Sequence, residues 1–209
     1  MRLVTSIALA ILVAAPGCAD TRSVYGPEVP GDAAFVRIVN AVPGSSALQT
    51  ELGATAFEPL SYAEASPYRA VTPDIYFFSA SGQEREIIPM SGRYYTVAVL
   101  PDAIVVLDDP AHTDPARAQL FLYNLSSLPR VDLATADGKT RVIADVRSRS
   151  SGLAVVNAVA ASLAVTSGGA RVKLVGDLGL ARGSSFSVFV LGGGSAAVVF
   201  TAKARVQVE

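Results

Sequence analysis

The chain has 209 residues, of which 51% are apolar and 17% are charged, a composition typical of a globular protein of one or two domains. Its formal net charge of −1 argues against a nucleic-acid-binding protein. Its single cysteine, Cys18, excludes an internal disulfide.

The N-terminal segment has the pattern of a secretory signal peptide. Met1 and Arg2 precede an apolar run over residues 3–15, and small residues follow up to Ala19. The run is shorter than the about 20 apolar residues that a transmembrane helix needs. We therefore expect residues 1–19 to be a signal peptide and the mature protein to be periplasmic. Lipid modification of Cys18 is the alternative to simple cleavage near Ala19.

The rest of the chain is a series of short segments rich in Val, Ile, Tyr and Phe and separated by turn residues, a pattern typical of β-strands. Asp137-Gly138 lies between two such segments and favours a type I′ hairpin turn. Many short strands at this spacing predict an all-β sandwich or barrel. The expected strands include residues 35–40, 75–79, 94–100, 119–124, 131–135, 140–144, 163–166, 170–175, 187–191 and 197–201.

Two pairs of related strings indicate an internal duplication. The string FVRIVN at 35–40 has a counterpart 84 residues later in QLFLYN at 119–124. The string GRYYTVAVL at 92–100 has a counterpart 91 residues later in GSSFSVFVL at 183–191. We therefore predict two tandem Ig-like β-sandwich domains. The signal peptide (1–19) would be followed by a first domain (20–107), a polar linker with two prolines (108–115) and a second domain (116–209).

The linker contains the only histidine of the chain. Asp109 and His112 form an Asp-x-x-His pair, in which a carboxylate can orient an imidazole, as in SGNH-type esterases and acetyltransferases. Such enzymes also need a serine, usually in Gly-Asp-Ser, but Ala33 follows Gly31-Asp32 here. We therefore interpret His112 as a solvated linker residue and predict no catalytic residue and no enzyme activity.

Two further groups of charged residues could bind a ligand. Three linker aspartates offer oxygen ligands for a hard cation, but their spacing fits no calcium loop, so we expect neither a metal site nor a cofactor. Three arginines around a serine-rich loop could pair with the carboxylates of a uronate polymer or of an acidic partner, although a solvated loop is the simpler interpretation. The aspartates are Asp108, Asp109 and Asp114, and the arginines are Arg141, Arg147 and Arg149.

The two halves of the chain differ in charge. Residues 20–107 carry 5 Arg and 10 Asp or Glu, a net charge of −5, whereas residues 116–209 carry 11 Lys or Arg and 5 Asp or Glu, a net charge of +6. This difference has two interpretations. It is either ordinary variation of the surface, or the second half faces an anionic polymer or an acidic protein.

An ordered set of short strings runs along most of the chain. The set begins with Tyr25-Gly-Pro27 and AFVRIVNA at 34–41, and continues with GRYYTVAVL at 92–100. It then runs through DDP at 108–110, YNL at 123–125, TADGKT at 135–140 and Val142-Ile143. This set resembles the AlgF family of alginate O-acetylation accessory proteins. The order is kept to about residue 146, and a weaker match extends to about residue 191.

The resemblance implies an exported adaptor required for the O-acetylation of alginate, without an active site of its own. Its expected partners are a membrane-bound O-acyltransferase and SGNH-type acetyltransferases. Two alternatives stay open. One is an Ig-like carbohydrate-binding or adhesive envelope module that uses the basic second half, and the other is a cryptic acetylesterase or acetyltransferase that uses His112.

Overall fold

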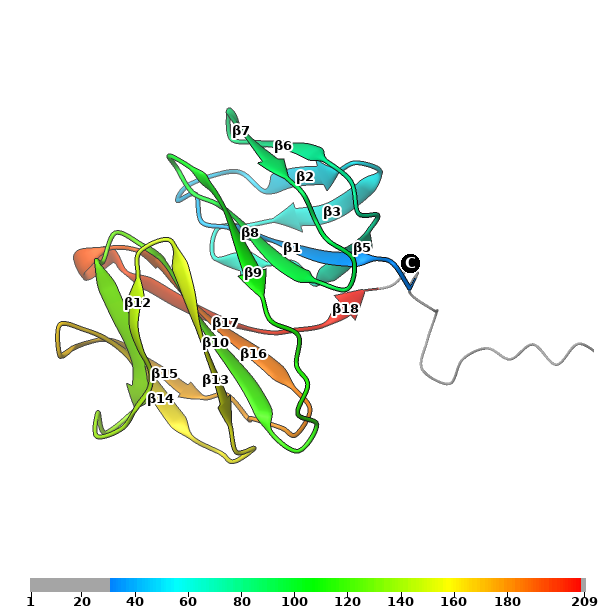
Figure 1. Cartoon of the computed structure of the whole chain (residues 1–209). Coiled ribbons are helices and arrows are strands. Elements are labelled where there is room, and N and C mark those ends of the chain that lie inside the picture. The colour runs from blue at the N-terminus through cyan, green and yellow to red at the C-terminus, as the bar shows by residue number, and fades with distance from the viewer. Residues whose placement is uncertain (1–30, 208–209) are drawn as a thin grey trace, which may run out of the picture.

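The computed structural model describes residues 31–207, which form strands joined by turns and one 3₁₀ turn, η1 (Gly194–Ala196). These residues include no helix with the length and hydropathy of a membrane-spanning segment. The expected signal peptide, with Cys18, lies outside the described residues. The strands fall into two sandwiches that follow one another along the chain (Figure 1). The prediction of an all-β fold with two tandem sandwiches is confirmed.

The first sandwich has one continuous sheet and a second layer of two hairpins. The continuous sheet has the order β5-β1-β8-β9, with β4 paired to the end of β1. Its strands are β1 (Ala34–Asn40), β4 (Glu64–Ala65), β5 (Tyr68–Val71), β8 (Tyr94–Val99) and β9 (Ile104–Asp109). The hairpins are β2 (Leu48–Leu52) with β3 (Thr55–Leu60), and β6 (Tyr76–Ala80) with β7 (Gln83–Ile87).

The second sandwich repeats this arrangement with two four-stranded sheets, in the orders β13-β10-β16-β17 and β12-β11-β14-β15. The strands of the first of these sheets are β10 (Ala118–Ser126), β13 (Ser150–Val156), β16 (Ser185–Gly192) and β17 (Val198–Lys203). Those of the other are β11 (Arg130–Thr135), β12 (Arg141–Arg147), β14 (Ser162–Ser167) and β15 (Ala170–Asp177).

The strand register follows the internal duplication. In the first sandwich β1 pairs in parallel with β8, with Phe35 opposite Tyr94. In the second, β10 pairs in parallel with β16, with Gln119 opposite Ser185. These partners are related by the same offsets of 84 and 91 residues that relate the repeated strings. The duplicated strings therefore form the equivalent central strand pair of each sandwich.

A buried asparagine closes the first strand of each sandwich in the same way. The Oδ1 of Asn40 accepts the backbone N–H of Val42 at 3.0 Å, and its Nδ2 donates to the carbonyl of Leu60 at 2.9 Å. The Oδ1 of Asn124 accepts the N–H of Ser126 at 3.2 Å, and its Nδ2 donates to two carbonyls. An asparagine that bonds to the backbone two residues ahead turns the chain out of the strand.

The boundaries of the two sandwiches differ in two places from the expected division. Asp108 and Asp109 belong to β9, where they lie opposite Tyr95 and Tyr94 of β8, so the segment between the sandwiches begins at residue 110. At the other end, β18 (Val206–Gln207) leaves the second sandwich and pairs in parallel with β5 of the first (Figure 1).

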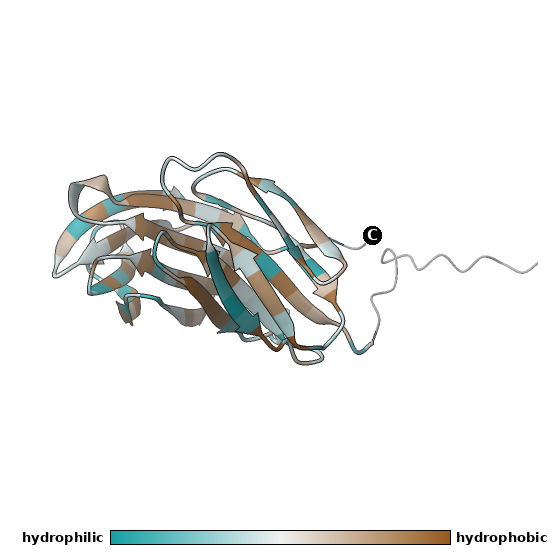
Figure 2. Cartoon of the chain, turned by 90° about the horizontal axis from the view of Figure 1, so that it is seen from above, coloured by the Kyte–Doolittle hydropathy of each residue, from teal (hydrophilic) through white to brown (hydrophobic). Residues whose placement is uncertain are grey.

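Each sandwich has its own apolar core, and a third apolar cluster lies between the two. The strands alternate between hydrophobic and hydrophilic residues in many places (Figure 2), as expected for sheets with one face in a core. The central strands, however, are buried on both faces: all nine residues of β10 are buried. One face of each central sheet lines its own core, and the other faces the neighbouring sandwich.

Candidate functional site

The candidate site lies where the two sandwiches meet. In β1, Val36 and Ile38 point into the first core, so Arg37 and Val39 point to the opposite face of the sheet. That face packs against the second sandwich. The apolar side chains of this interface include Val39, Ala41, Ala98, Leu100, Phe121, Tyr123, Leu125, Phe189 and Leu191.

Arg37 is the polar centre of the interface and is only 1% exposed. Its Nε donates to Thr96 Oγ1 at 2.8 Å within the first sandwich. Its Nη2 donates to Tyr123 Oη at 2.8 Å and to Ser187 Oγ at 2.9 Å, both in the second sandwich. Thr96 and Ser187 occupy equivalent positions of the duplication, 91 residues apart. One guanidinium therefore links the two central sheets through matching hydroxyl groups.

Aromatic rings surround the same guanidinium. Its central carbon lies 4.6 Å from the ring centroid of Tyr68, 5.3 Å from that of Tyr123 and 5.1 Å from that of Phe189. Cation–π contacts of this kind are strongest where water is excluded. The planar, weakly hydrated guanidinium is suited to such a buried position.

Asp109, the last residue of β9, supplies the countercharge and is 2% exposed. Its Oδ2 accepts hydrogen bonds from Tyr68 Oη at 2.7 Å and from Thr96 Oγ1, and its Oδ1 accepts one from Tyr123 Oη at 2.6 Å. Its Oδ2 lies 3.9 Å from Arg37 Nη2. The carboxylate therefore accepts hydrogen bonds from three hydroxyls and faces a buried positive charge.

The tyrosines of this cluster remain protonated donors. Burial raises the pKa of Tyr123 well above its ordinary value, and Arg37 opposes this shift only in part. Burial raises the pKa of Tyr68 in the same way, and its hydrogen bond to Asp109 adds to the shift. For Arg37, burial acts to lower the pKa, but the two tyrosines and Asp109 outweigh it, so the pKa is raised and the side chain stays charged.

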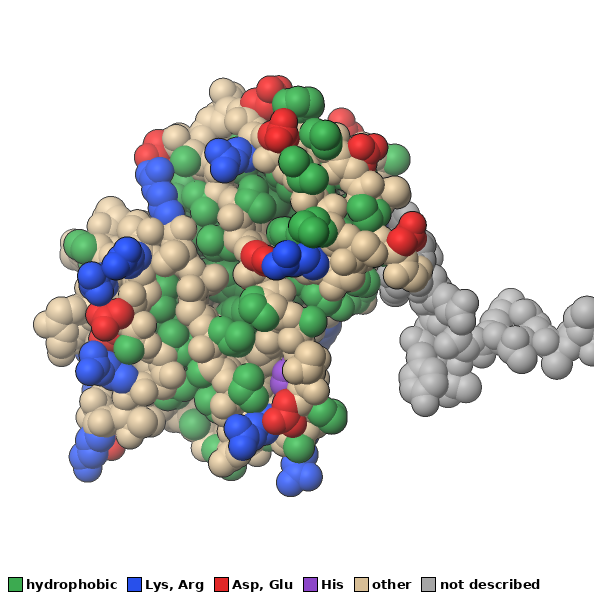
Figure 3. All heavy atoms as spheres, viewed as in Figure 1, with side chains coloured by type: hydrophobic (Ala, Val, Ile, Leu, Met, Phe, Trp, Pro, Cys, Tyr) green, Lys and Arg blue, Asp and Glu red, His purple; other side chains and the backbone are tan. Residues whose placement is uncertain are grey.

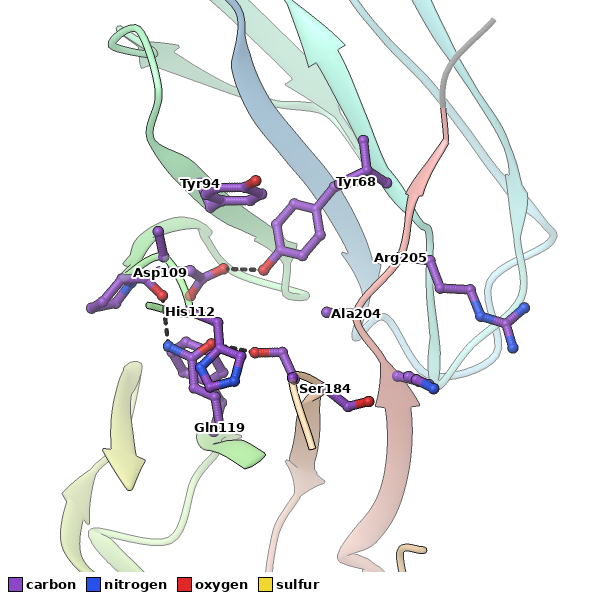
Figure 4. A pocket seen from close by; sticks show the side chains of 15 residues that line it. Tyr68, Tyr94, Asp109, His112, Gln119, Ser184, Ala204 and Arg205 are labelled. Carbon is purple, nitrogen blue, oxygen red and sulfur yellow. Dashed lines mark hydrogen bonds between the residues drawn. The ribbon is translucent and has the colours of Figure 1, made fainter. Parts of the chain in front are cut away.

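A cavity of about 260 Å³ adjoins the cluster and is lined by residues of both sandwiches (Figure 4). Tyr68, Tyr94 and Asp109 form one wall. Gln119 is fixed in the cavity, because its Nε2 donates to the carbonyl of Pro110 at 2.8 Å and its Oε1 accepts from the hydroxyl of Ser185. Lys203 and Arg205 also border the cavity, but Arg205 points away from Tyr68 and Asp109 (Figure 4), and Lys203 Nζ lies 5.8 Å from the ring centroid of Phe186.

Asp109 and His112, the two residues of the Asp-x-x-His pair, bond to different partners in this structure. His112 lines the cavity, but its Nε2 lies 3.0 Å from the carbonyl oxygen of Arg117. The oxygens of Asp109 are occupied by the three hydroxyls of the buried cluster. Asp109 thus serves the interface between the sandwiches, and His112 bonds within the segment that joins them.

The three aspartates considered as cation ligands are held apart. Asp108 pairs with Arg93, Asp109 is buried opposite Arg37, and Asp114 lies 3.6 Å from Arg117 Nε. Within residues 31–207, no three His, Cys, Asp or Glu side chains lie together as a metal site would require.

The three arginines considered as a cluster are also separated. Arg141 and Arg147 are the first and last residues of β12, which at about 3.3 Å per residue places their Cα atoms about 20 Å apart. Arg149 pairs with Asp102 of the first sandwich. It therefore forms a second ionic link between the sandwiches, one that is exposed to solvent.

Sequence reasoning missed Arg37, Tyr68 and Thr96. The sequence does contain a signal for Arg37. It lies in an apolar strand, on the same face as Val39, where a charged side chain exposed to solvent is not expected. Its partners could not be found from the sequence, because they lie 59 to 150 residues away along the chain.

Comparison with known proteins identifies the family. The family model described as "Alginate O-acetyl transferase AlgF" matches residues 5–187. The chain belongs to the AlgF family. The resemblance inferred from the ordered strings is therefore confirmed.

Relatives within the AlgF family match most of the chain. The "Alginate biosynthesis protein AlgF" of Pseudomonas aeruginosa is 32% identical over 177 residues, which cover 84% of this chain and 81% of the relative. The protein of the same name from Pseudomonas putida is 28% identical over 197 residues, covering 94% and 89%. A solved structure of the C-terminal domain of AlgF from P. aeruginosa is 34% identical over 42% of this chain and 98% of that domain, with a TM-score of 0.39.

Proposed function

We propose that this member of the AlgF family is an exported, non-catalytic adaptor for the O-acetylation of alginate. In this proposal it binds the acetyltransferases of the machinery, namely a membrane-bound O-acyltransferase and SGNH-type enzymes, and keeps them in a productive arrangement. The names of the family and of its relatives support the polymer and the process.

The buried Arg37–Asp109 cluster is the observation that carries the adaptor role. Its hydrogen bonds cross the interface between the sandwiches, so any relative movement would separate buried charges from their partners. Two domains held in a fixed orientation suit a protein that positions partners. The same cluster uses the carboxylate that a catalytic His112 would need.

Polymer-bound acetate provides the test. We expect deletion of the gene in the source bacterium to abolish acetate on the polymer while the polymer is still made, and the restored gene to recover it. The variant His112→Ala should restore acetate as well as the unchanged gene does. A folded His112→Ala protein that fails to restore acetate would favour a catalytic role instead.

The periplasmic location needs its own measurement. Cell fractionation with mass spectrometry of the mature N-terminus should find the protein in the periplasm, beginning near Asp20. A mature chain that begins at Cys18 with attached lipid would indicate a lipoprotein. An uncleaved chain in the cytoplasm would contradict export.

One observation favours the alternative of a carbohydrate-binding module. Residues 116–209 carry 11 Lys or Arg and 5 Asp or Glu, so the carboxylates of a uronate polymer would find positive charge on this half of the chain. If deletion of the gene leaves polymer acetate unchanged, the next measurement is the affinity of the protein for polyuronate. This affinity should fall as the salt concentration rises.

A further inference from the structure

The outer face of the first sandwich carries an exposed apolar patch on the β6–β7 hairpin. Phe78 and Ile87 point into the core, so the residues that alternate with them, Phe77 and Ile88, point outward. Their neighbours Ile75 and Met90 are exposed as well. We call these four side chains, which are 54% to 66% exposed, the β6–β7 patch: Ile75, Phe77, Ile88 and Met90.

The pairing of the two strands holds most of this patch together. Tyr76 lies opposite Ile87 in the last pair of the hairpin, and Ile75 and Ile88 are the next residues of the chain at its open end. Phe77 lies opposite Glu86, beside the isoleucines on the same face. The patch thus combines an aromatic ring with branched aliphatic side chains, as the centre of a protein interface often does.

Carboxylates border the patch. Glu84 and Glu86 alternate with Ile88 on the outward face of β7, and Asp74 immediately precedes Ile75. In the space-filling view, red carboxylates and green apolar side chains lie side by side at the top of the first sandwich, where Figure 1 places β6 and β7 (Figure 3).

Burial makes the first sandwich more acidic at its surface than the sequence suggests. Residues 31–109 contain four arginines, but Arg37 and Arg69 are buried, which leaves Arg85 and Arg93 at the surface. Of the ten carboxylates in the same range, only Asp109 is buried. The nine exposed ones are Asp32, Glu51, Glu58, Glu64, Asp74, Glu84, Glu86, Asp102 and Asp108. The patch therefore belongs to a sandwich whose surface has nine negative and two positive side chains.

We propose that the β6–β7 patch is the docking surface for a protein partner that presents apolar side chains ringed by Lys and Arg. The proposal rests on the proposed function, because the partner is then one of the acetyltransferases of the machinery. Apolar contacts at the centre supply affinity, and the ring of opposite charge speeds association and selects the partner.

Other occupants fit this surface less well. A polyuronate or an anionic membrane carries the same sign of charge as the border of the patch and would be repelled. A second copy of the chain offers positive charge on its second sandwich, where the exposed apolar side chains are spread over two sheets. Leu153 and Val155 on β13 are 40% and 42% exposed, less than the side chains of the patch, and Val159 follows that strand, whereas Leu174 lies on β15 of the other sheet.

The test measures binding of the full mature chain to each purified SGNH-type acetyltransferase of the source bacterium. We expect Phe77→Asp to weaken binding at least ~30-fold, as loss of a central aromatic anchor does. The double variant Glu84→Lys/Glu86→Lys should weaken binding about tenfold at low salt and reduce its dependence on salt. Leu174→Asp is the matched control, because Leu174 is similarly exposed, at 53%, on the second sandwich. It should change affinity less than about twofold.

Restoration of polymer acetate in the deletion strain makes the result decisive, provided that circular dichroism shows each variant to be folded. Failure of Phe77→Asp to restore acetate, together with full restoration by Leu174→Asp, would support the proposal. Normal binding and full restoration by Phe77→Asp would refute the docking surface and leave the adaptor function standing. Unchanged acetate after gene deletion would instead refute the adaptor function. A dimer that Phe77→Asp dissociates on gel filtration would assign the patch to a second copy and overturn the proposal.

Discussion

The buried Arg37 provides the most direct test of how the two sandwiches are held together. The substitution Arg37→Met keeps an unbranched side chain of similar length and removes the charge and all five N–H donors. It therefore deprives Thr96, Tyr123 and Ser187 of a donor, and it leaves the carboxylate of Asp109 without its countercharge.

The expected cost is about 3 kcal/mol of the free energy of unfolding. Removing one partner of a buried ion pair costs about 3–5 kcal/mol, because the other charge stays in a dry environment. The lower end applies here for two reasons. Asp109 keeps its three hydroxyl donors, and its oxygen lies 3.9 Å from the guanidinium rather than in direct contact. This is a large share of the about 5–15 kcal/mol that stabilises a typical domain.

The measurement is urea denaturation at neutral pH, followed by far-ultraviolet circular dichroism and by tyrosine fluorescence. Because Arg37 joins the two sandwiches, the variant should also separate the two signals into distinct transitions. The double variant Arg37→Met/Asp109→Asn removes both charges, so its loss should fall about 2 kcal/mol short of the sum of the single losses.

The exposed pair Arg149–Asp102 is the matched control, since it also joins an arginine to an aspartate across the interface. Its side chains are 47% and 64% exposed, so Arg149→Gln should cost less than about 1 kcal/mol. A loss for Arg37→Met no greater than that for Arg149→Gln, or additive losses in the double variant, would refute the view that a buried ionic cluster locks the sandwiches.

Three further predictions concern single residues. Burial raises the pKa of Tyr123 in the folded protein, so the contribution of this tyrosine to the free energy of unfolding is complete below pH 10. Above pH 10 that contribution falls by about 1.4 kcal/mol per pH unit. In urea titrations between pH 10 and about 11.5, Tyr123→Phe should therefore lose stability with pH less steeply than the unchanged protein. A Cβ at Gly152 would lie 2.6 Å from Ile143 Cγ2 and 2.7 Å from Val146 Cγ2, so Gly152→Ala should cost about 1–3 kcal/mol and lower the melting temperature, and an unchanged melting temperature would contradict this. Asn124→Ala removes the side-chain donor from the buried carbonyl of Val146 and the partly buried carbonyl of Leu128, and should cost about 1–3 kcal/mol in the same assay. A loss below about 0.5 kcal/mol would show that water replaces the amide.

The strand pattern and the duplication could be predicted from the sequence because they depend on local information. Alternation of apolar and polar residues marks a strand with one face in a core, and the Asp137-Gly138 turn marks a hairpin. The repeated strings ending in Asn40 and Asn124 place the equivalent strands of the two sandwiches. Each of these signals is contained in a few consecutive residues.

The interface between the sandwiches could not be predicted in the same way. A strand such as β10 is apolar on both faces, and the sequence does not say which face lines the core and which meets a neighbouring domain. β18 has only two residues, too few to show an alternation, and it pairs with a strand more than 130 residues earlier. Because residues 108–115 read as a polar linker, Asp109 was expected at the surface. In the fold, three hydroxyls and a guanidinium offset the cost of burying its carboxylate.

Burial changes which charged residues of each half remain at the surface, and so which half is the better candidate for binding a partner. In the sequence, the basic second half has two interpretations, and in one of them its arginines near a serine-rich loop meet an anion. In the fold, Arg149 is used in a link to the first sandwich, while burial of Arg37 and Arg69 removes positive charge from the acidic half. The surface with the stronger signal for a protein partner is therefore that of the first sandwich, where Glu86 lies opposite the exposed Phe77 on the β6–β7 hairpin. Arg37 holds the two sandwiches in a fixed orientation, so its loss should impair the adaptor function by changing the arrangement of the domains. Loss of Phe77 should leave that arrangement intact and remove only a contact with the partner.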